Sequence, residues 1–549
     1  VASVMLDYGL APIDQVAHHA AAAAELVDDI GQVEGVSAVM REQALDLLSR
    51  AAARSLDVGA FAQAMRQASR ALALLDDDGE STRRDLQLVR ARAAVERRDT
   101  DAAHDDAREV LELSIADGDV RQEAIARRLL GGVAQQRGEL DDARTELTRS
   151  VELLRSIDEP YELTTSLSDR GFVEVFGGSL VDADRLLAEA EELAAELEDR
   201  RRLAWIRQHQ AWVAFLSGDT ALAEERLSVS SGLFDDLGDR SGTGWAMGLL
   251  AYVRFFERRF ADAEELAAAV RSDAVELGEL WAPAMMDSLM ASVRVWTGRF
   301  SEAEELSRRA LGTFRDLNDR FGVVQALAPR MRSLVALGRP QEAERSLEEA
   351  LSMADAFGDL AMPTMAAAGT AAHLGLGERA VTLGEVAVSR IEAMHADHSE
   401  ANTTLALGLC QTGDSDRALA TLTGIRDHGP YTRAVHALAS SLAGLADDAV
   451  EIADSVVDDP TASYLDRVVA DVAAGAAVVA DDPADAGFRL DRAMSTARTV
   501  GDAAATALVS SAGHSLLEAF NAPPPDHLGA GWRRVIDDLV TSSQRTSSV

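Results

Sequence analysis

The sequence predicts an all-α protein: a right-handed superhelical solenoid of antiparallel helix pairs, with about a dozen repeats. Three observations lead to this prediction. Small residues recur every forty positions, and each forty-residue unit contains two stretches with helical spacing of its apolar residues. One helix pair cannot bury its own apolar face, so neighbouring pairs must stack on each other.

The forty-residue period is set by two turn points and one alanine in each unit. The first turn point falls at Arg98, Gly138, Gly178, Gly218, Arg258, Gly298 and Gly338. An alanine follows five positions later, at Ala103, Ala143, Ala183, Ala223, Ala263, Ala303 and Ala343. The second turn point falls at Gly118, Asp158, Glu198, Gly238, Gly278, Asn318 and Gly358. Gly59 with Ala64 begins an earlier unit, which is shifted by one residue.

The segment between two turn points has the pattern of an amphipathic helix. In residues 298–318, apolar side chains recur at steps of three and four, at Phe300, Ala303, Leu306, Ala310, Phe314 and Leu317. Gly or Asn at the second turn point suits a left-handed cap, and Gly at the first suits a tight turn between helices. The recurring alanine allows the two helices of a pair to approach closely.

The segments "GRFSEAEELSRRAL" and "GELDDARTELTRSVELL" resemble the tetratricopeptide repeat in a forty-residue bacterial form. The glycine, the alanine five positions later and the small residues Ala310 and Ala350 match small positions of that family. The aromatic and proline positions of the shorter family form are mostly absent. The resemblance implies that the first helix of each pair lines an inner, concave surface where ligands dock.

The repeat pattern also divides the chain. Residues 1–58 are expected to form N-terminal helices, a cap or a connector to an upstream domain, and 59–377 to form the regular repeats. Shorter, degenerate helical repeats are expected in 378–522, with units starting near Gly377, Gly413, Gly444 and Pro483. A capping helix is expected in 523–541, with its helical part in 530–541, and a disordered tail in 542–549.

The N-terminal part carries a second resemblance. The segment "VAHHAAAAAELVDD" and residues 41–75 are similar to segments that follow the ATPase module in STAND-type signalling proteins. These include transcriptional activators and multidomain adenylyl cyclases. The resemblance implies that this chain is the C-terminal sensor or scaffold arm of a longer bacterial regulator.

The charged composition excludes several functions. All 53 basic residues are arginine, so a Walker A lysine, a Schiff-base lysine and a kinase lysine are absent. The net charge of -39 disfavours binding to nucleic acid and to anionic membranes. Arginine in place of lysine, with abundant Ala and Asp, fits a GC-rich genome such as an actinobacterial one; a salt-adapted archaeon is the alternative.

No catalytic constellation stands out. Cys410 is the single cysteine and lies in an apolar run, which suits a buried thiol and a cytoplasmic location. His395 and His398 could share a helix face as metal ligands, but a turn at a helix end is the favoured interpretation. We therefore expect no enzyme activity, no cofactor and no metal site.

The best candidate site is a set of aromatic and arginine side chains on the first helices of three units: Trp205, Trp212, Trp245, Tyr252, Arg254 and Arg294. Trp205 and Trp245 are one repeat apart, and so are Trp212 and Tyr252. These rings could instead pack in the core, which is the commoner fate of aromatics at helical spacing. Trp, Tyr and Arg are nevertheless the residues that anchor interfaces.

The expected function is a non-catalytic scaffold or sensor that binds a protein, a peptide or another domain of its own chain. The alternative is a small-molecule sensor with a pocket near Trp205, Trp212, Trp245 and Arg254. A peptide groove predicts aromatics spread over several repeats, whereas a small-molecule site predicts one enclosed cavity.

Overall fold

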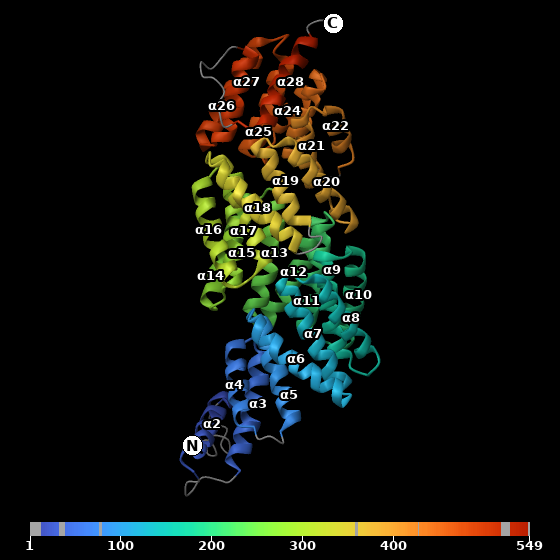
Figure 1. Cartoon of the computed structure of the whole chain (residues 1–549), viewed down its shortest axis with the longest axis vertical. Helices are drawn as coiled ribbons and strands as arrows, with labels where there is room; N and C mark the ends of the chain where they lie inside the picture. The colour runs from blue at the N-terminus through green and yellow to red at the C-terminus, as the bar shows by residue number, and fades with distance from the viewer. Residues whose placement is uncertain are drawn as a thin grey trace. The chain divides into compact units, whose positions relative to one another are not determined.

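The structure is a computed structural model that describes residues 12–31, 39–75, 79–356, 361–425, 428–517 and 528–546. These residues form 27 α-helices and, within the described ranges, no β-strand (Figure 1). The all-α prediction is therefore confirmed. The proposed turn point at Gly358 and most of the proline-rich segment that precedes the last helix lie outside the described residues.

The helices follow each other with short connections. The first fourteen are α2 (Ile13–Ile30), α3 (Met40–Asp57), α4 (Phe61–Ala73), α5 (Glu80–Glu96), α6 (Thr100–Asp117), α7 (Val120–Arg137), α8 (Leu140–Arg155), α9 (Pro160–Gly177), α10 (Leu180–Glu196), α11 (Arg200–Leu216), α12 (Thr220–Asp236), α13 (Arg240–Phe256), α14 (Phe260–Glu276) and α15 (Trp281–Trp296). The others are α16 (Phe300–Asp316), α17 (Arg320–Ala336), α18 (Pro340–Ala356), α19 (Ala361–Leu374), α20 (Gly377–Ala393), α21 (Ser399–Thr412), α22 (Ser415–Thr423), α23 (Pro430–Leu442), α24 (Ala446–Val457), α25 (Tyr464–Val478), α26 (Pro483–Val500), α27 (Ala503–Leu517) and α28 (Ala530–Thr546).

Left-handed residues follow the helices at most of the predicted turn points, but Gly178 and Asp158 do not take this conformation. At the first point, Gly138, Gly218, Gly298 and Gly338 have φ between 70° and 84°. Arginine takes the same conformation where glycine is missing, with φ of 57° at Arg98 and 61° at Arg258. At the second point, Gly118, Glu198, Gly238, Gly278 and Asn318 also have positive φ. Residues other than glycine accept roughly 1–2 kcal/mol of strain there, which shows how firmly the repeat fixes the turn.

The recurring alanine is the tightest position of each pair. The side chains of Ala103, Ala143, Ala183, Ala223, Ala263, Ala303 and Ala343 are all completely buried. Gly322 shows the same closeness between successive helices, because a Cβ atom on it would collide with the ring of Phe314. The prediction of helix pairs that stack through small residues is therefore confirmed, and consecutive helices pack as sequential pairs.

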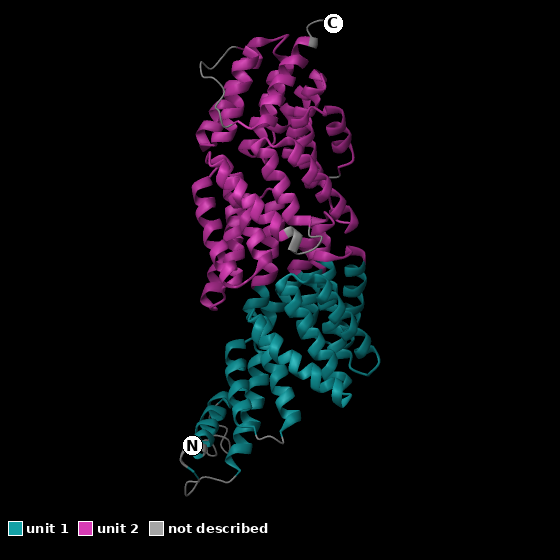
Figure 2. Ribbon diagram, viewed as in Figure 1, with its two compact units in different colours: residues 1–175, 182–209, 229–243 teal, residues 176–181, 210–228, 244–549 magenta. Residues whose placement is uncertain are grey.

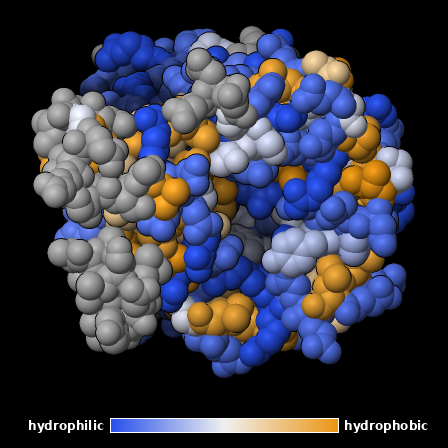
Figure 3. Space-filling model, turned by 90° about the horizontal axis from the view of Figure 1, so that it is seen from below, coloured by the Kyte–Doolittle hydropathy of each residue, from blue (hydrophilic) through white to orange (hydrophobic). Residues whose placement is uncertain are grey.

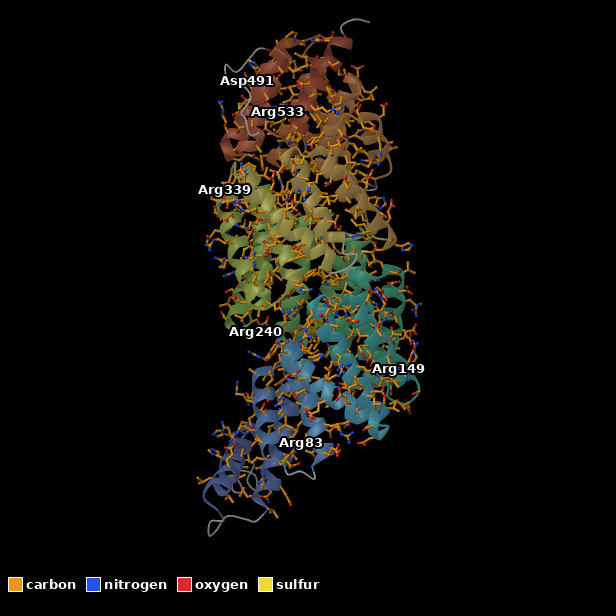
Figure 4. The ribbon with its side chains drawn as sticks, in the orientation of Figure 1. Arg83, Arg149, Arg240, Arg339, Asp491 and Arg533 are labelled. Atoms are coloured by element: carbon orange, nitrogen blue, oxygen red, sulfur yellow. The ribbon has the colours of Figure 1, made fainter. Side chains whose placement is uncertain are left out.

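The chain forms two compact units (Figure 2). Unit 1 comprises residues 1–175, 182–209 and 229–243, and unit 2 comprises 176–181, 210–228 and 244–549. Charged side chains cover the outside of the helices: Arg149 lies at the outer edge of unit 1, where it pairs with Glu152 at 3.1 Å (Figure 4). The face in Figure 3 is mostly hydrophilic, with hydrophobic residues in small groups.

Within unit 2, the C-terminal helices pack against the turns of earlier repeats. The backbone N–H of Asp397 donates to the carbonyl of Leu216 at 2.8 Å. The ring of Phe300, at the start of α16, lies 5.7 Å from that of Tyr464, at the start of α25. These contacts link segments that are far apart in the sequence.

The structure places the two candidate histidines, His395 and His398, and the end of the last helix. His395 ends α20 with a φ of 60° and His398 precedes α21, so both lie in a turn, as favoured. The last helix continues past residue 541 to Thr546, which corrects the expected start of the disordered tail. Its extension is held in place because the Ser542 hydroxyl donates to the carbonyl of Ser441 at 3.0 Å. No described helix combines the length and the apolar character needed to span a membrane.

Candidate functional site

The six side chains of the predicted patch do not fall in one compact unit. Trp205 belongs to unit 1, and Trp212, Trp245, Tyr252, Arg254 and Arg294 belong to unit 2. All four aromatic rings are half-buried, so they are neither fully core nor freely exposed. Their surroundings differ and are described in turn.

Trp205 lies in an aromatic cluster of unit 1. Its ring contacts that of Phe234 edge-on, with centroids 5.1 Å apart, and lies 6.2 Å from the His209 ring. His209 stacks on Phe172 at 4.3 Å, and its Nδ1 lies 3.0 Å from the Ser168 hydroxyl. Burial lowers the pKa of His209 to about 3, so this imidazole is neutral near pH 7.

Trp212 and Tyr252 occupy equivalent positions of consecutive repeats in unit 2. Both rings pack against the buried side chains of Ala211, Leu227 and Leu249 and their neighbours. The Nε1 of Trp212 and the hydroxyl of Tyr252 are buried, yet neither has a hydrogen-bond partner among the described residues. An unpaired buried donor costs roughly 1–3 kcal/mol.

Trp245 is anchored differently from the other rings of the patch. It stacks on Trp281 with centroids 4.8 Å apart and an interplanar angle of 21°. The indole N–H of Trp281 donates to Asp319 at the start of α17. The stack therefore ties three successive first helices, α13, α15 and α17, to each other.

Arg254 and Arg294 are one repeat apart and make equivalent ion pairs with the preceding second helix. Arg254 is buried and pairs with Glu224 and with Glu257. Arg294 binds Glu264 at 3.1 Å and Glu302 at 3.1 Å. The recurrence of Glu thirty positions before Arg is a signal in the sequence that indicates these pairs. Both guanidinium groups are thus already occupied.

Unit 1 contains a charged cluster that the sequence analysis missed. Arg92 on α5 donates to Glu162 on α9 at 2.7 Å, and Arg128 on α7 pairs with Asp169 on α9 at 3.2 Å. Burial alone would raise the pKa of Glu162, but Arg92, Arg128 and Arg202 together hold it down at about 2. The signal for this cluster would have been the charged residues that interrupt the apolar spacing of the first helices.

Glu96 borders this cluster at the end of α5. Its side chain is exposed to solvent. Loss of solvation, with a smaller contribution from Asp169, raises the pKa of Glu96 to about 7.

Two other candidates can be placed. Cys410 is fully buried on α21, as expected, and burial raises the pKa of its thiol to about 12. Within the described ranges, no group of three or more His, Cys, Asp or Glu side chains is arranged to hold a metal ion.

Comparison with known proteins identifies the fold but no family. No protein-family model matches the sequence, and no curated protein matches it. The chain is similar to the solved structure of a Rap protein complexed with Competence and Sporulation Factor, with a TM-score of 0.51 and 12% identity over 64% of this chain and 99% of that one.

Two further solved structures are similar at lower scores. One is the APC/C hetero-tetramer Cut9-Hcn1, with a TM-score of 0.49 and 13% identity over 85% of this chain and 92% of that one. The other is a STAND protein with a tetratricopeptide repeat sensor from Pyrococcus horikoshii, with a TM-score of 0.41 and 14% identity over 67% of this chain and 55% of that one. At such identities the likeness shows the fold alone: a tetratricopeptide-like helical repeat array.

Proposed function

We propose that the chain is a non-catalytic scaffold or sensor arm of a signalling protein, and that it binds a peptide or protein segment through the first helices of its repeats. The observation that carries this proposal is the pair of unpartnered donors, Trp212 Nε1 and Tyr252 OH, on half-buried rings at equivalent positions. An extended peptide that crosses successive repeats presents backbone carbonyls at regular intervals. Carbonyls of this kind are what the two donors lack; because both donor atoms are buried, the half-buried rings must turn outward when the peptide binds.

The fold supports a binding role. Stacked repeats display long surfaces whose equivalent positions can differ from one repeat to the next. The Rap protein of similar fold is a complex with a named factor, which agrees with a partner-binding use of such arrays. The sensor arm of a STAND-type regulator, with an ATPase or cyclase domain elsewhere in a longer chain, is the specific form that we propose.

The alternative is a small-molecule sensor that uses the same residues. Its support in unit 1 is the half-buried ring of Trp205 beside the buried, neutral His209, which together resemble the mostly apolar lining of effector sites. A small ligand would engage one unit only, whereas a peptide can engage several repeats.

Tyr252→Phe tests the proposal, because it removes only the unpartnered hydroxyl. Peptides are selected from a random display library on the full chain, and their binding is measured by fluorescence anisotropy. We expect Tyr252→Phe to leave the melting temperature unchanged or higher, and to weaken the best peptide by roughly 3- to 10-fold, the value of one neutral hydrogen bond.

Tyr464→Phe is the matched control for stability. The Tyr464 hydroxyl donates to Asp502 at 2.9 Å, so the same chemical change should lower the melting temperature there. Unchanged peptide binding by Tyr252→Phe would refute the proposal. If no peptide is selected, but compounds from a metabolite extract bind the wild-type chain and not the variant, the small-molecule alternative is correct.

A further inference from the structure

The turn between α20 and α21 makes two backbone contacts with much earlier parts of unit 2. The N–H of Leu180, at the start of α10, donates to the carbonyl of Met394 at 3.2 Å. The N–H of Asp397 donates to the carbonyl of Leu216, at the end of α11, at 2.8 Å. All four residues belong to unit 2, and one short turn thus holds segments of two earlier repeats. We call these two hydrogen bonds the latch.

The turn that carries the latch is fixed by its own residues and is strained. His395 has a φ of 60°, a left-handed conformation that is unfavourable for a residue other than glycine. The Asp397 carboxylate accepts from the backbone N–H of Ser399 at 3.2 Å and from its hydroxyl at 2.7 Å. Gly218 leaves room for the turn, because a Cβ atom on it would lie 3.3 Å from the Cβ of Asp397. Backbone strain that persists in a folded chain is typical of switch regions.

The latch lacks the apolar support of the other contacts between early repeats and later helices of unit 2. The contact of Phe300 with Tyr464 lies inside one continuous hydrophobic cluster. The buried residues beside the latch belong instead to two separate clusters, with Ala214 in one and Ile391 in the other. Residues 394–397 also keep contact with solvent. Hydrogen bonds in such surroundings open at a lower free energy than those of the core.

The latch lies next to a ring that carries the proposed function. Trp212 is one helical turn before Leu216, and its ring contacts that of Phe176 edge-on, with centroids 5.2 Å apart. Phe176, at the end of α9, is four residues before Leu180. The latch therefore holds the backbone on both sides of this ring contact. Because the indole N–H of Trp212 is buried, a ligand reaches it only after the ring moves.

We propose that the latch is a conformational switch, which opens while the helix pairs stay folded and which must open before a peptide binds at Trp212. Opening breaks both hydrogen bonds, passes their N–H and carbonyl groups to water and releases the strain at His395. The control of peptide binding rests on the proposed function, whereas the opening itself does not.

Two engineered disulfides test the switch. Gly218→Cys with Asp397→Cys closes the latch covalently, since the two Cβ positions are 3.3 Å apart, close to the roughly 3.5–4.5 Å of natural disulfides. Gly338→Cys with Ala503→Cys is the matched control, with the same separation of 3.3 Å, at a place where α27 packs on the same hydrophobic cluster as α17. Both glycines are left-handed, with φ of 84° and 70°. Cys410 is buried and does not interfere.

The first readout is amide hydrogen exchange of fragments that contain Leu180, which needs no ligand. Diamide oxidises each cysteine pair and dithiothreitol reduces it, so each variant is compared with itself. Oxidation of the 218–397 pair should slow exchange of the Leu180 N–H roughly tenfold or more, because the closed latch cannot open. Oxidation of the control pair should leave this exchange unchanged. The proposal is overturned if the 218–397 disulfide has no effect, or if the control disulfide slows the exchange equally.

The second readout is the affinity for the best peptide selected on the wild-type chain. Oxidation of the 218–397 pair should weaken this peptide by roughly tenfold or more, because only the open form binds, and the control disulfide should leave its affinity unchanged. Equal binding by the oxidised and reduced 218–397 variant would overturn the control of binding by the latch. If the wild type selects no peptide, the proposed function and this control fail together, and the exchange measurement alone decides whether the latch opens.

Discussion

Arg258→Met removes the centre of the contacts that join the regular repeats of unit 2 to its C-terminal helices. Arg258 ends its helix in a left-handed conformation and reaches across to the start of α25. There it pairs with Asp466, whose side chain is fully buried, and donates to the carbonyl of Thr461 at 3.1 Å. Its guanidinium also lies 5.0 Å from the centroid of the Trp296 ring.

The expected cost of the substitution follows from these three contacts. Breaking a buried ion pair from one side costs about 3–5 kcal/mol, because the remaining charge has no partner. The substitution also removes a backbone hydrogen bond and a cation–π contact, which add to this cost. Asp466 can take up a proton, which lowers the cost, so we keep the same range for the total. For a unit of this size, the loss corresponds to a fall of roughly 5–10 °C in melting temperature.

The assay is scanning calorimetry of the full chain, with Arg259→Met as the matched control. Arg259 is the adjacent arginine but pairs with Asp262 at the surface, where both side chains are about half exposed, so its loss should cost at most about 1 kcal/mol. Equal effects of the two substitutions would refute the reasoning. The double substitution Arg258→Met with Asp466→Asn should cost less than the sum of the single ones.

The pH dependence of this variant has a definite sign. Burial raises the pKa of Asp466 in the folded chain, and Arg258 opposes that rise. Without Arg258 the folded-state pKa rises further above the unfolded value. The folded chain then keeps its proton while the unfolded chain loses it, so stability falls as pH rises through that interval. The penalty of Arg258→Met should therefore be smallest near the ordinary pKa of an aspartate, about 4, and should grow as the pH rises above it.

Two further substitutions test the packing of the repeat and the charge of unit 1. Gly322→Ala should lower the free energy of unfolding, measured in urea, by roughly 1–3 kcal/mol, because its Cβ would collide with the Phe314 ring. The control is Gly312→Ala: Gly312 is helical and has open space, so this change should stabilise the chain by about 0.5–1 kcal/mol. Similar effects of the two substitutions would contradict the close packing at Gly322. Glu96 has a pKa of about 7 in the folded chain against an ordinary 4.5, so the folded state is progressively disfavoured between these values as pH rises. Glu96→Gln should thus raise the melting temperature increasingly from pH 5 to 8, and a constant difference would contradict the raised pKa.

The sequence predicted what depends on local spacing. A period of forty fixes which residues become turns and which become tight contacts, so the left-handed residues and the buried alanines could be foreseen. The pair of Arg258 and Asp466 could not, since 208 positions separate the two residues and no repeat relates them. The half-burial of Trp212 and Tyr252 was also beyond the sequence, because periodicity gives the face of a helix but not the elements that cover that face.

The residues that differ along one position of the repeat are the strongest guide to function. Alanine is constant five positions after each turn and is completely buried in every repeat. The position of Trp212 instead changes to Tyr252, Ser292 and Arg332 in successive repeats, although the geometry of the helix is the same. A position that served packing alone would keep one shape and would not leave an indole N–H and a phenol hydroxyl unpaired among the described residues. The variation is instead what we expect of a surface whose contacts with a bound peptide differ from one repeat to the next.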